Sequence, residues 1–161
     1  MDVIIAGSTG VYQALVVARI MLKPPGQTRL REAIAPPFGD IVLEKQGELI
    51  YLGTSRQGIR FYSLGLDPNP VIGMKIIRSF LTIMGGEQAQ PLVLRVPEPG
   101  AFLIRVARIV FLIPGIGRPV SRRLAEASIR SNWSRLTGAA TAMRRVVEAD
   151  GSGALPAVLD Q

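Results

Sequence analysis

The feature that most constrains the fold stands at the start of the chain, where a short apolar run leads into a glycine turn. Residues Val3 to Ala6 are all apolar, and Gly7-Ser8-Thr9-Gly10 follows them. A short, continuous apolar run is typical of a strand that is buried on both faces of a parallel sheet. Val11 to Leu22 then has helical character, and Lys23-Pro24-Pro25-Gly26 ends it. We therefore expect a central strand, a glycine turn and a helix.

Strand and helix patterns continue to alternate along the chain. Leu49 to Leu52 and Ile59 to Leu64 predict a hairpin, because both are rich in β-forming residues and Gly58 in the loop between them can take a positive φ. Further segments predict a short helix at 28–36, a helix at Val71 to Met84, a strand at Pro91 to Val96 and a helix at Ala101 to Ile113. The predicted fold class is α/β, with a three-layer, mostly parallel, Rossmann-like sheet and one antiparallel hairpin.

The last predicted element is a long C-terminal helix that runs from near Pro119 to about Val147. Apolar residues recur along it at helical spacing: Ile129, Trp133, Leu136, Ala140, Met143 and Val147. Gly138 interrupts the pattern at a cost of about 1 kcal/mol relative to Ala, so a kink or two shorter helices are alternatives. We expect a single domain over residues 1–149 and a flexible tail at 150–161, which has turn formers and no periodicity.

The absence of cysteine and histidine limits the chemistry of the chain. Without Cys there is no disulfide, thiolate nucleophile or Cys-ligated metal, and without His there is no Ser-His-Asp triad. No carboxylate pair stands out as catalytic, since Glu44 and Glu48 only flank the hairpin. The start of the chain lacks the basic segment of a signal peptide. We therefore predict a cytoplasmic, non-catalytic domain without metal or cofactor.

A membrane span is also not predicted. The most apolar later stretch, Ala101 to Ile113, contains 13 residues and carries Arg105 and Arg108. A spanning helix needs about 20 mostly uncharged residues. This stretch therefore predicts a buried helix, and we do not expect an integral membrane protein.

The glycine turn allows three interpretations. The dinucleotide-binding pattern needs a third glycine where this chain has Gln13, and the segment 26–31 offers no acidic residue for a ribose. No Lys-Ser or Lys-Thr follows the glycines, so a Walker A loop is excluded. Two alternatives besides a dinucleotide site stay open: a generic anion site at a helix N-terminus, and a plain turn capped by Ser8 or Thr9. The candidate ligand-binding residues are Gly7, Ser8, Thr9, Gly10, Tyr12 and Gln13.

Positive charge is concentrated in the C-terminal half. The whole chain has a net charge of +7, and residues 95–145 carry ten Arg against Glu98 and Glu126, a local charge of +8. Arginine favours bidentate recognition of carboxylate or phosphate. Arg123, Arg130 and Arg144 are spaced by multiples of seven, which places them on one helix face that we expect to point outward. The candidate residues for binding an anionic partner are Arg118, Arg122, Arg123, Arg130 and Arg144.

Several partners fit such a face. A phosphate-containing small molecule, an acidic protein, RNA or a membrane surface could each meet it, and the alternative is a solvated face without a partner. Trp133 lies on the apolar stripe, so aromatic side chains for base stacking are scarce and sequence-specific nucleic-acid binding is disfavoured. The oligomeric state is not predicted.

Two segments resemble a known family. LGTSRQGIRFYSLGLDPNPVIGMKIIRSFLTIMG, at residues 52–85, and Gly-Ile-Gly-Arg-Pro, at 115–119, are similar to the domain-of-unknown-function family 3189. The resemblance implies a small α/β protein over residues 1–147, from a family known mainly in spore-forming Gram-positive bacteria. It also implies a His-Ser-Ser signature after the glycines, where this chain has Tyr12-Gln13-Ala14. The N-terminal motif is therefore degenerate, and chemistry that depends on that His is not carried over.

The resemblance leaves the function open among three hypotheses. The first is a non-catalytic domain that binds an anionic ligand or partner through the glycine turn and the C-terminal arginines. The second is a small enzyme that acts on a phosphorylated or carboxylated metabolite and uses Ser8, Thr9 or Tyr12. The third is a structural or interaction protein in a sporulation-type setting.

Overall fold

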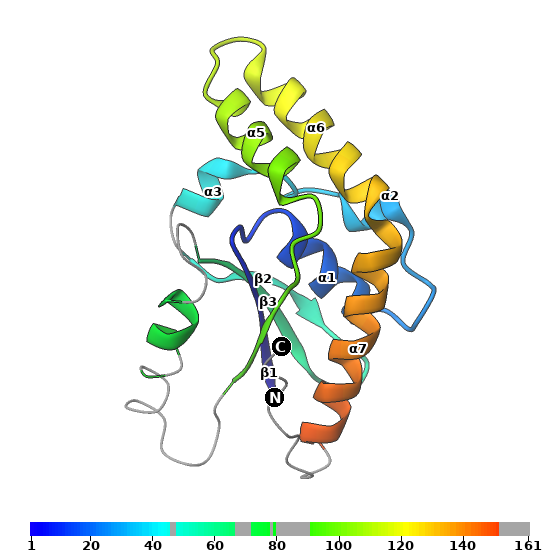
Figure 1. Ribbon diagram of the computed structural model, residues 1–161. Helices are drawn as coiled ribbons and strands as arrows, with labels where there is room; N and C mark the ends of the chain where they lie inside the picture. Colours follow the sequence, from blue (N-terminus) through cyan, green and yellow to red (C-terminus); the bar gives the residue numbers. More distant parts are fainter. Residues whose placement is uncertain (46–47, 67–71, 78, 80–90, 152–161) are drawn as a thin grey trace.

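A four-stranded mixed sheet forms the centre of the fold in the computed structural model, which describes residues 1–45, 48–66, 72–77, 79 and 91–151 (Figure 1). Its strands are β1 (Asp2–Gly7), β2 (Ile50–Thr54), β3 (Arg60–Gly65) and β4 (Leu92–Arg95), in the spatial order β2-β3-β1-β4. β1 pairs in parallel with β3 and β4, and β2 pairs antiparallel with β3. The predicted α/β class, the central first strand and the antiparallel hairpin are confirmed.

The burial of β1 follows from its position between two parallel neighbours. Val3 pairs with Phe61 of β3 and with Leu92 of β4, and Val3, Ile5 and Ala6 have no exposed surface. Both faces of the strand therefore need apolar side chains, which is why the sequence pattern is continuous and does not alternate.

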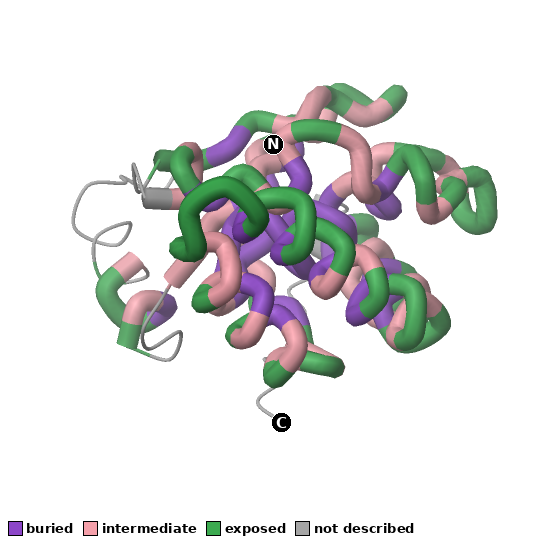
Figure 2. Tube along the Cα trace, turned by 90° about the horizontal axis from the view of Figure 1, so that it is seen from above, coloured by how far each residue is buried: buried purple, intermediate pink, exposed green. Residues whose placement is uncertain are grey.

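The helices pack on this sheet and on one another. Their bounds are α1 (Gln13–Leu22), α2 (Leu30–Ala33), α3 (Ile41–Lys45), α5 (Ala101–Phe111), α6 (Gly117–Ser131) and α7 (Trp133–Gly151). α1 contacts β1 and β3 on one side and α7 on the other. All residues of α1 except Arg19 and Leu22 are buried. Figure 2 shows the buried residues gathered in the middle of the molecule, with exposed segments around them.

The long C-terminal helix is two helices, and the break does not lie at Gly138. α6 ends at Ser131 and α7 begins at Trp133, because Asn132 closes α6. The side-chain amide of Asn132 donates to the Ser128 carbonyl at 2.9 Å, and its backbone N–H donates to the same carbonyl at 3.2 Å. The predicted apolar stripe nevertheless continues across the break, since Ile129, Leu136 and Val147 are all buried.

Other element predictions differ in extent. The helix expected at 28–36 is only the four-residue α2, and α3 was not predicted. Residues 72–77 and 79 are helical. The rest of the helix expected at Val71 to Met84 lies outside the described residues, so the third layer of the predicted three-layer fold stays a prediction. α7 continues to Gly151, and the remaining part of the predicted tail, 152–161, is also outside the described residues.

Candidate functional site

The glycine turn lies where α/β proteins with open sheets usually bind their ligands. From β1 the chain crosses to β3 on one side, and it later returns to β4 on the other side of β1. The carboxyl ends of these three parallel strands meet at one edge of the sheet, and the turn that follows β1 is at this topological switch point (Figure 1). The position favours a ligand site. Whether a ligand can bind there depends on which groups of the chain already contact the N–H donors of the turn.

Two carboxylates already accept hydrogen bonds from the backbone of this turn. The Ser8 N–H donates to Glu98 Oε1, from the loop between β4 and α5. The Gly10 N–H donates to Glu44 Oε1 of α3 at 3.3 Å. The turn therefore does hold anionic oxygens, but the chain supplies them itself. An external phosphate or carboxylate at these two N–H groups would have to displace Glu98 and Glu44. The sequence analysis did not identify either glutamate as part of the turn.

The glycines of the turn allow two backbone segments to approach closely. A Cβ atom on Gly10 would lie 2.8 Å from the Gly65 backbone nitrogen at the end of β3, and a Cβ on Gly65 would lie 2.8 Å from the Gly10 nitrogen. Neither Gly7 nor Gly10 has a positive φ. The glycine at position 10 is thus required by packing against β3, and this requirement is independent of any ligand.

The side chains that follow the turn are used inside the protein. The Gln13 side-chain amide donates to the Pro99 carbonyl at 3.0 Å, which ties α1 to the loop that carries Glu98. The Tyr12 ring meets the Phe38 ring edge to face, with centroids 5.5 Å apart. Tyr12, Gln13 and Thr9 have at most 2% of their surface exposed, whereas Ser8 is half-buried. A ligand-binding role for Tyr12 and Gln13 stays a prediction, and it would require these contacts to open.

Burial also changes the ionisation of Tyr12. Removal of its phenol from water raises the pKa of Tyr12 above its usual value, and the negative charge of Glu44 acts in the same direction. The hydroxyl of Ser121 on α6 and the charge of Arg108 oppose this increase. Tyr12 is therefore a neutral phenol at physiological pH, as expected for a core residue.

Neither hydroxyl of the turn caps α1. The helix begins at Gln13, and its N-cap is Tyr12, which makes no side-chain capping hydrogen bond. The interpretation of Ser8 or Thr9 as a cap is wrong, because residues 10–12 form an additional turn between these hydroxyls and the first helical residue.

Arg144 does not point outward as predicted. Its guanidinium Nη2 donates to the carbonyls of Ile20 and Met21, at 2.9 and 3.3 Å, and of Lys23 at 2.6 Å. These carbonyls lie at the end of α1 and just beyond it, where a helix leaves acceptors without intrahelical donors. Sequence spacing placed Arg144 on the face of Arg123 and Arg130, but the break at Asn132 and the packing of α7 on α1 direct it into the structure.

The other four predicted arginines are exposed on α6. Arg122 forms an ion pair with Glu126 at 2.9 Å, and Arg118 lies over the Phe111 ring, 5.7 Å from its centroid. Arg123 and Arg130 are exposed. These four arginines, Arg118, Arg122, Arg123 and Arg130, are called the α6 arginines below.

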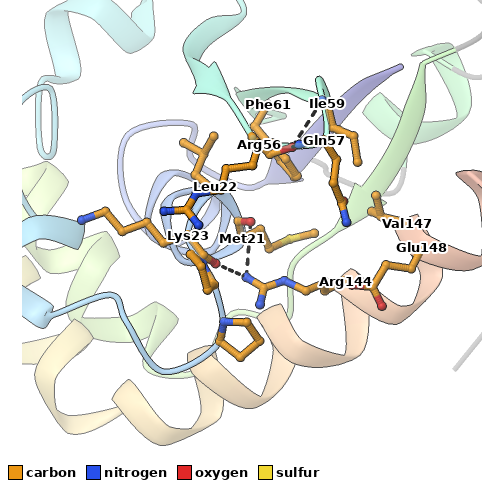
Figure 3. Close-up of a pocket in the computed structure, with 13 residues that line it drawn as sticks. Met21, Leu22, Lys23, Arg56, Gln57, Ile59, Phe61, Arg144, Val147 and Glu148 are labelled. Atoms are coloured by element: carbon orange, nitrogen blue, oxygen red, sulfur yellow. Dashed lines mark hydrogen bonds between the residues drawn. The ribbon is translucent and has the colours of Figure 1, made fainter.

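A separate cleft of about 250 Å³ opens at the opposite end of α1 (Figure 3). It lies between the end of α1, the loop of the β2–β3 hairpin and α7, and its polar lining includes Lys23, Arg56, Gln57 and Arg144. Lys23 is paired with Glu32 at 2.8 Å, and Arg144 is held by the carbonyls of α1. The volume is below the usual range for ligand pockets, about 300–1,000 Å³. The cleft was not predicted from the sequence, and its basic side chains mainly join the elements around it.

Metal-binding clusters and membrane-spanning helices are both absent from the part of the chain that the structure describes. No group of three or more acidic side chains is arranged to hold a metal ion. No described helix is both long and apolar enough to cross a membrane.

Comparison with known proteins identifies the family. The sequence matches the family of proteins of unknown function DUF3189 over residues 2–145, and the chain belongs to this family. No curated protein and no solved structure matches the chain. The resemblance stated from residues 52–85 and 115–119 is confirmed at the level of the family, while the expected bacterial origin and the degenerate glycine-turn signature stay predictions.

Proposed function

We propose that this chain is a non-catalytic cytoplasmic domain that binds an anionic partner, and that the α6 arginines make the contact. The observation that carries the proposal is the different use of the two predicted sites. The N–H donors of the glycine turn are occupied by Glu98 and Glu44, whereas the side chains of the α6 arginines are exposed. Exposed guanidinium groups on one element can pair with phosphate or carboxylate groups of a partner without any rearrangement of the fold.

The charge distribution around α6 supports the same proposal. Between Pro99 and Ala125 the chain has five arginines and no acidic residue. Glu126 is the only acidic residue of α6, and it forms an ion pair with Arg122. It lies three residues after Arg123 and four before Arg130, so α6 carries one carboxylate against four arginines. A surface of one sign attracts a partner of the opposite sign over about one Debye length, 8–10 Å at physiological salt.

The experiment measures binding to a duplex DNA of random sequence, used as a test polyanion, at several salt concentrations. Each lost phosphate contact lowers the slope of log K against log salt by about 0.9. We expect the double variant Arg123→Gln/Arg130→Gln to lower the slope by up to about 1.8. The matched control, Arg31→Gln/Arg56→Gln, removes two exposed arginines from α2 and the hairpin loop. An equal decrease in both variants would contradict the proposal, because net charge alone would then explain the binding.

A second candidate function places a small anionic ligand at the glycine turn. The specific observation in its favour is that the Ser8 and Gly10 N–H groups already hold carboxylate oxygens at the switch point of the sheet. A phosphorylated or carboxylated metabolite could replace Glu98, which comes from a loop. The variant Glu98→Ala removes this competitor, so inorganic phosphate should raise the melting temperature of the variant more than that of the parent chain. Equal shifts would contradict a site at the turn.

A further inference from the structure

The α5–α6 hairpin exposes large apolar side chains at its outer end. It projects from the body of the molecule in Figure 1. At the outer end, Leu112 and Ile116 have 65% and 64% of their surface exposed, and along α5 Phe102 and Ile109 have 75% and 68% exposed. Isolated exposed apolar residues are ordinary, but a cluster on a projecting element indicates an interaction surface.

The apolar surface of α5 faces in two directions. Ile104 and Ala107 are buried and belong to the core, whereas Phe102, Ile109 and Leu112 are exposed along the same short helix. Phe102, Arg105, Ile109 and Leu112 are spaced by three, four and three residues, so one exposed arginine shares the outward face with three apolar residues. A face that combines large apolar side chains with arginine is typical of a segment at a membrane interface.

The outer end of the hairpin is a defined structure. A Cβ atom on Gly117 would lie 2.4 Å from the Val110 carbonyl oxygen, so only glycine allows α6 to start this close to the end of α5. The Gly117 N–H donates to the Ile113 carbonyl at 3.0 Å, and Gly115 has a φ of 82°. The exposure of Leu112 and Ile116 is therefore fixed by the turn that joins the helices.

Arginines lie both at the apolar end and behind it: Arg118 is two residues after Ile116, with its guanidinium over the Phe111 ring, and Arg105 and Arg123 lie further back. Arg105 precedes Leu112 by seven residues, and Arg123 follows Ile116 by seven. At 1.5 Å per residue, each is about 10 Å along its helix from the apolar end. Amphipathic segments insert about 5–10 Å into the boundary between lipid headgroups and acyl chains. The spacing would place these guanidinium groups at the level of the phosphates.

We propose that the α5–α6 hairpin docks on the surface of an anionic lipid bilayer, with Leu112, Ile113 and Ile116 inserted and the arginines against the phosphates. The inference rests on the proposed function, because it names the anionic partner of the same basic region. The 11-residue α5 is about 16 Å long, too short for a hydrocarbon core of about 30 Å, so the hairpin inserts only its outer end and does not span the bilayer.

Charge and shape favour lipid over other occupants of this surface. A second copy of the chain would bring arginines opposite arginines, and like charges in an interface are unfavourable. A nucleic acid would contact the arginines but offers little to aliphatic Leu112 and Ile116. A bilayer matches both properties, since anionic headgroups attract arginine and acyl chains accept the apolar end.

The experiment measures sedimentation of the full chain with phosphatidylcholine vesicles that contain either no anionic lipid or one quarter phosphatidylglycerol. We expect binding to the anionic vesicles only. Leu112→Ser/Ile116→Ser should weaken it at least about tenfold, and Arg105→Gln/Arg123→Gln about 30-fold. The matched control, Val42→Ser/Ile76→Ser, removes apolar side chains that are 52% and 63% exposed elsewhere, and it should leave binding unchanged.

The outcomes separate the inference from the proposed function. Binding to duplex DNA without binding to anionic vesicles would overturn the lipid inference and leave the proposed function intact. Vesicle binding that depends on the arginines but not on Leu112 and Ile116 would do the same, because the apolar end would have no role. If light scattering shows a dimer of the parent chain that is lost in the Leu112→Ser/Ile116→Ser variant, that result would assign the surface to a contact with a second copy of the chain and overturn the lipid inference. No binding to either DNA or vesicles would overturn both.

Discussion

The glycine turn and the α6 arginines have the same chemical attraction for an anion, but they differ in what already occupies them. The turn is almost entirely buried, and Glu98 and Glu44 accept hydrogen bonds from it. The α6 arginines stand on the exposed part of α6, whose other residues include the buried Ala125 and Ile129. An N–H group that is buried without an acceptor costs about 1–3 kcal/mol, so the fold provides acceptors for it, whereas an exposed guanidinium is solvated by water. Burial thus decides whether a group that attracts anions is used inside the fold or remains available to a partner.

The largest expected effect tests whether the turn is built for packing. Gly10→Ala should lower the free energy of unfolding by about 3 kcal/mol, because its Cβ would meet the Gly65 nitrogen at 2.8 Å and neither backbone segment can move without disturbing β1 or β3. Denaturant unfolding monitored by circular dichroism measures the change. Gly138→Ala is the control, since a Cβ there meets nothing within 4 Å on α7, and it should stabilise the chain by up to about 1 kcal/mol. A Gly10→Ala variant as stable as the parent would show that the turn is loose enough to reshape around a ligand.

The second prediction compares two arginines that the sequence places on one face. Arg144→Gln should lower the free energy of unfolding by about 2 kcal/mol, because three carbonyls at the end of α1 lose a charged donor. Arg130→Gln should change it by less than about 0.5 kcal/mol, as expected for an exposed helix position. Thermal and denaturant unfolding of the two variants give the values. If Arg130→Gln were as damaging as Arg144→Gln, the exposed arginines would also be part of the fold, and the contrast between the two regions would fail.

The sequence predicted the scaffold well because the patterns involved are local. Val3 to Ala6 and the stripe from Ile129 to Val147 depend on the spacing of apolar residues. The structure buries the first run and most of the stripe, in which Trp133 and Met143 are partly buried. The α/β class, the hairpin and the positive φ of Gly58 followed from the same kind of signal.

The candidate site was harder to predict because its contacts join distant segments. Glu98 is 90 residues from Ser8, and Glu44 is 34 residues from Gly10. No spacing rule connects such pairs. The exposed apolar end of the α5–α6 hairpin was missed for a related reason: Ala101 to Ile113 is apolar enough to predict a buried helix, and only the tertiary structure shows that one of its faces has no cover.

The smallest expected effect concerns the phenol of the buried Tyr12. Burial raises the pKa of Tyr12, so the folded state holds its phenolic proton more tightly than the unfolded chain. The stability that this provides is fully present below the unfolded pKa of about 10, and it is lost as the pH rises through the higher folded pKa. At pH 7, Tyr12→Phe should change the free energy of unfolding by less than about 1 kcal/mol, because the ring and its contact with Phe38 remain.

Alkaline titration makes this small difference measurable. The parent chain should lose stability above pH 10 more steeply than Tyr12→Phe. The unfolded parent releases the Tyr12 proton in this range while the folded parent keeps it, whereas Tyr12→Phe has no such proton. Identical slopes for the parent and Tyr12→Phe would mean that water reaches the phenol in solution. In that event Tyr12 would lie in an accessible site beside Ser121, and this result would support the hypothesis that a ligand binds at the glycine turn.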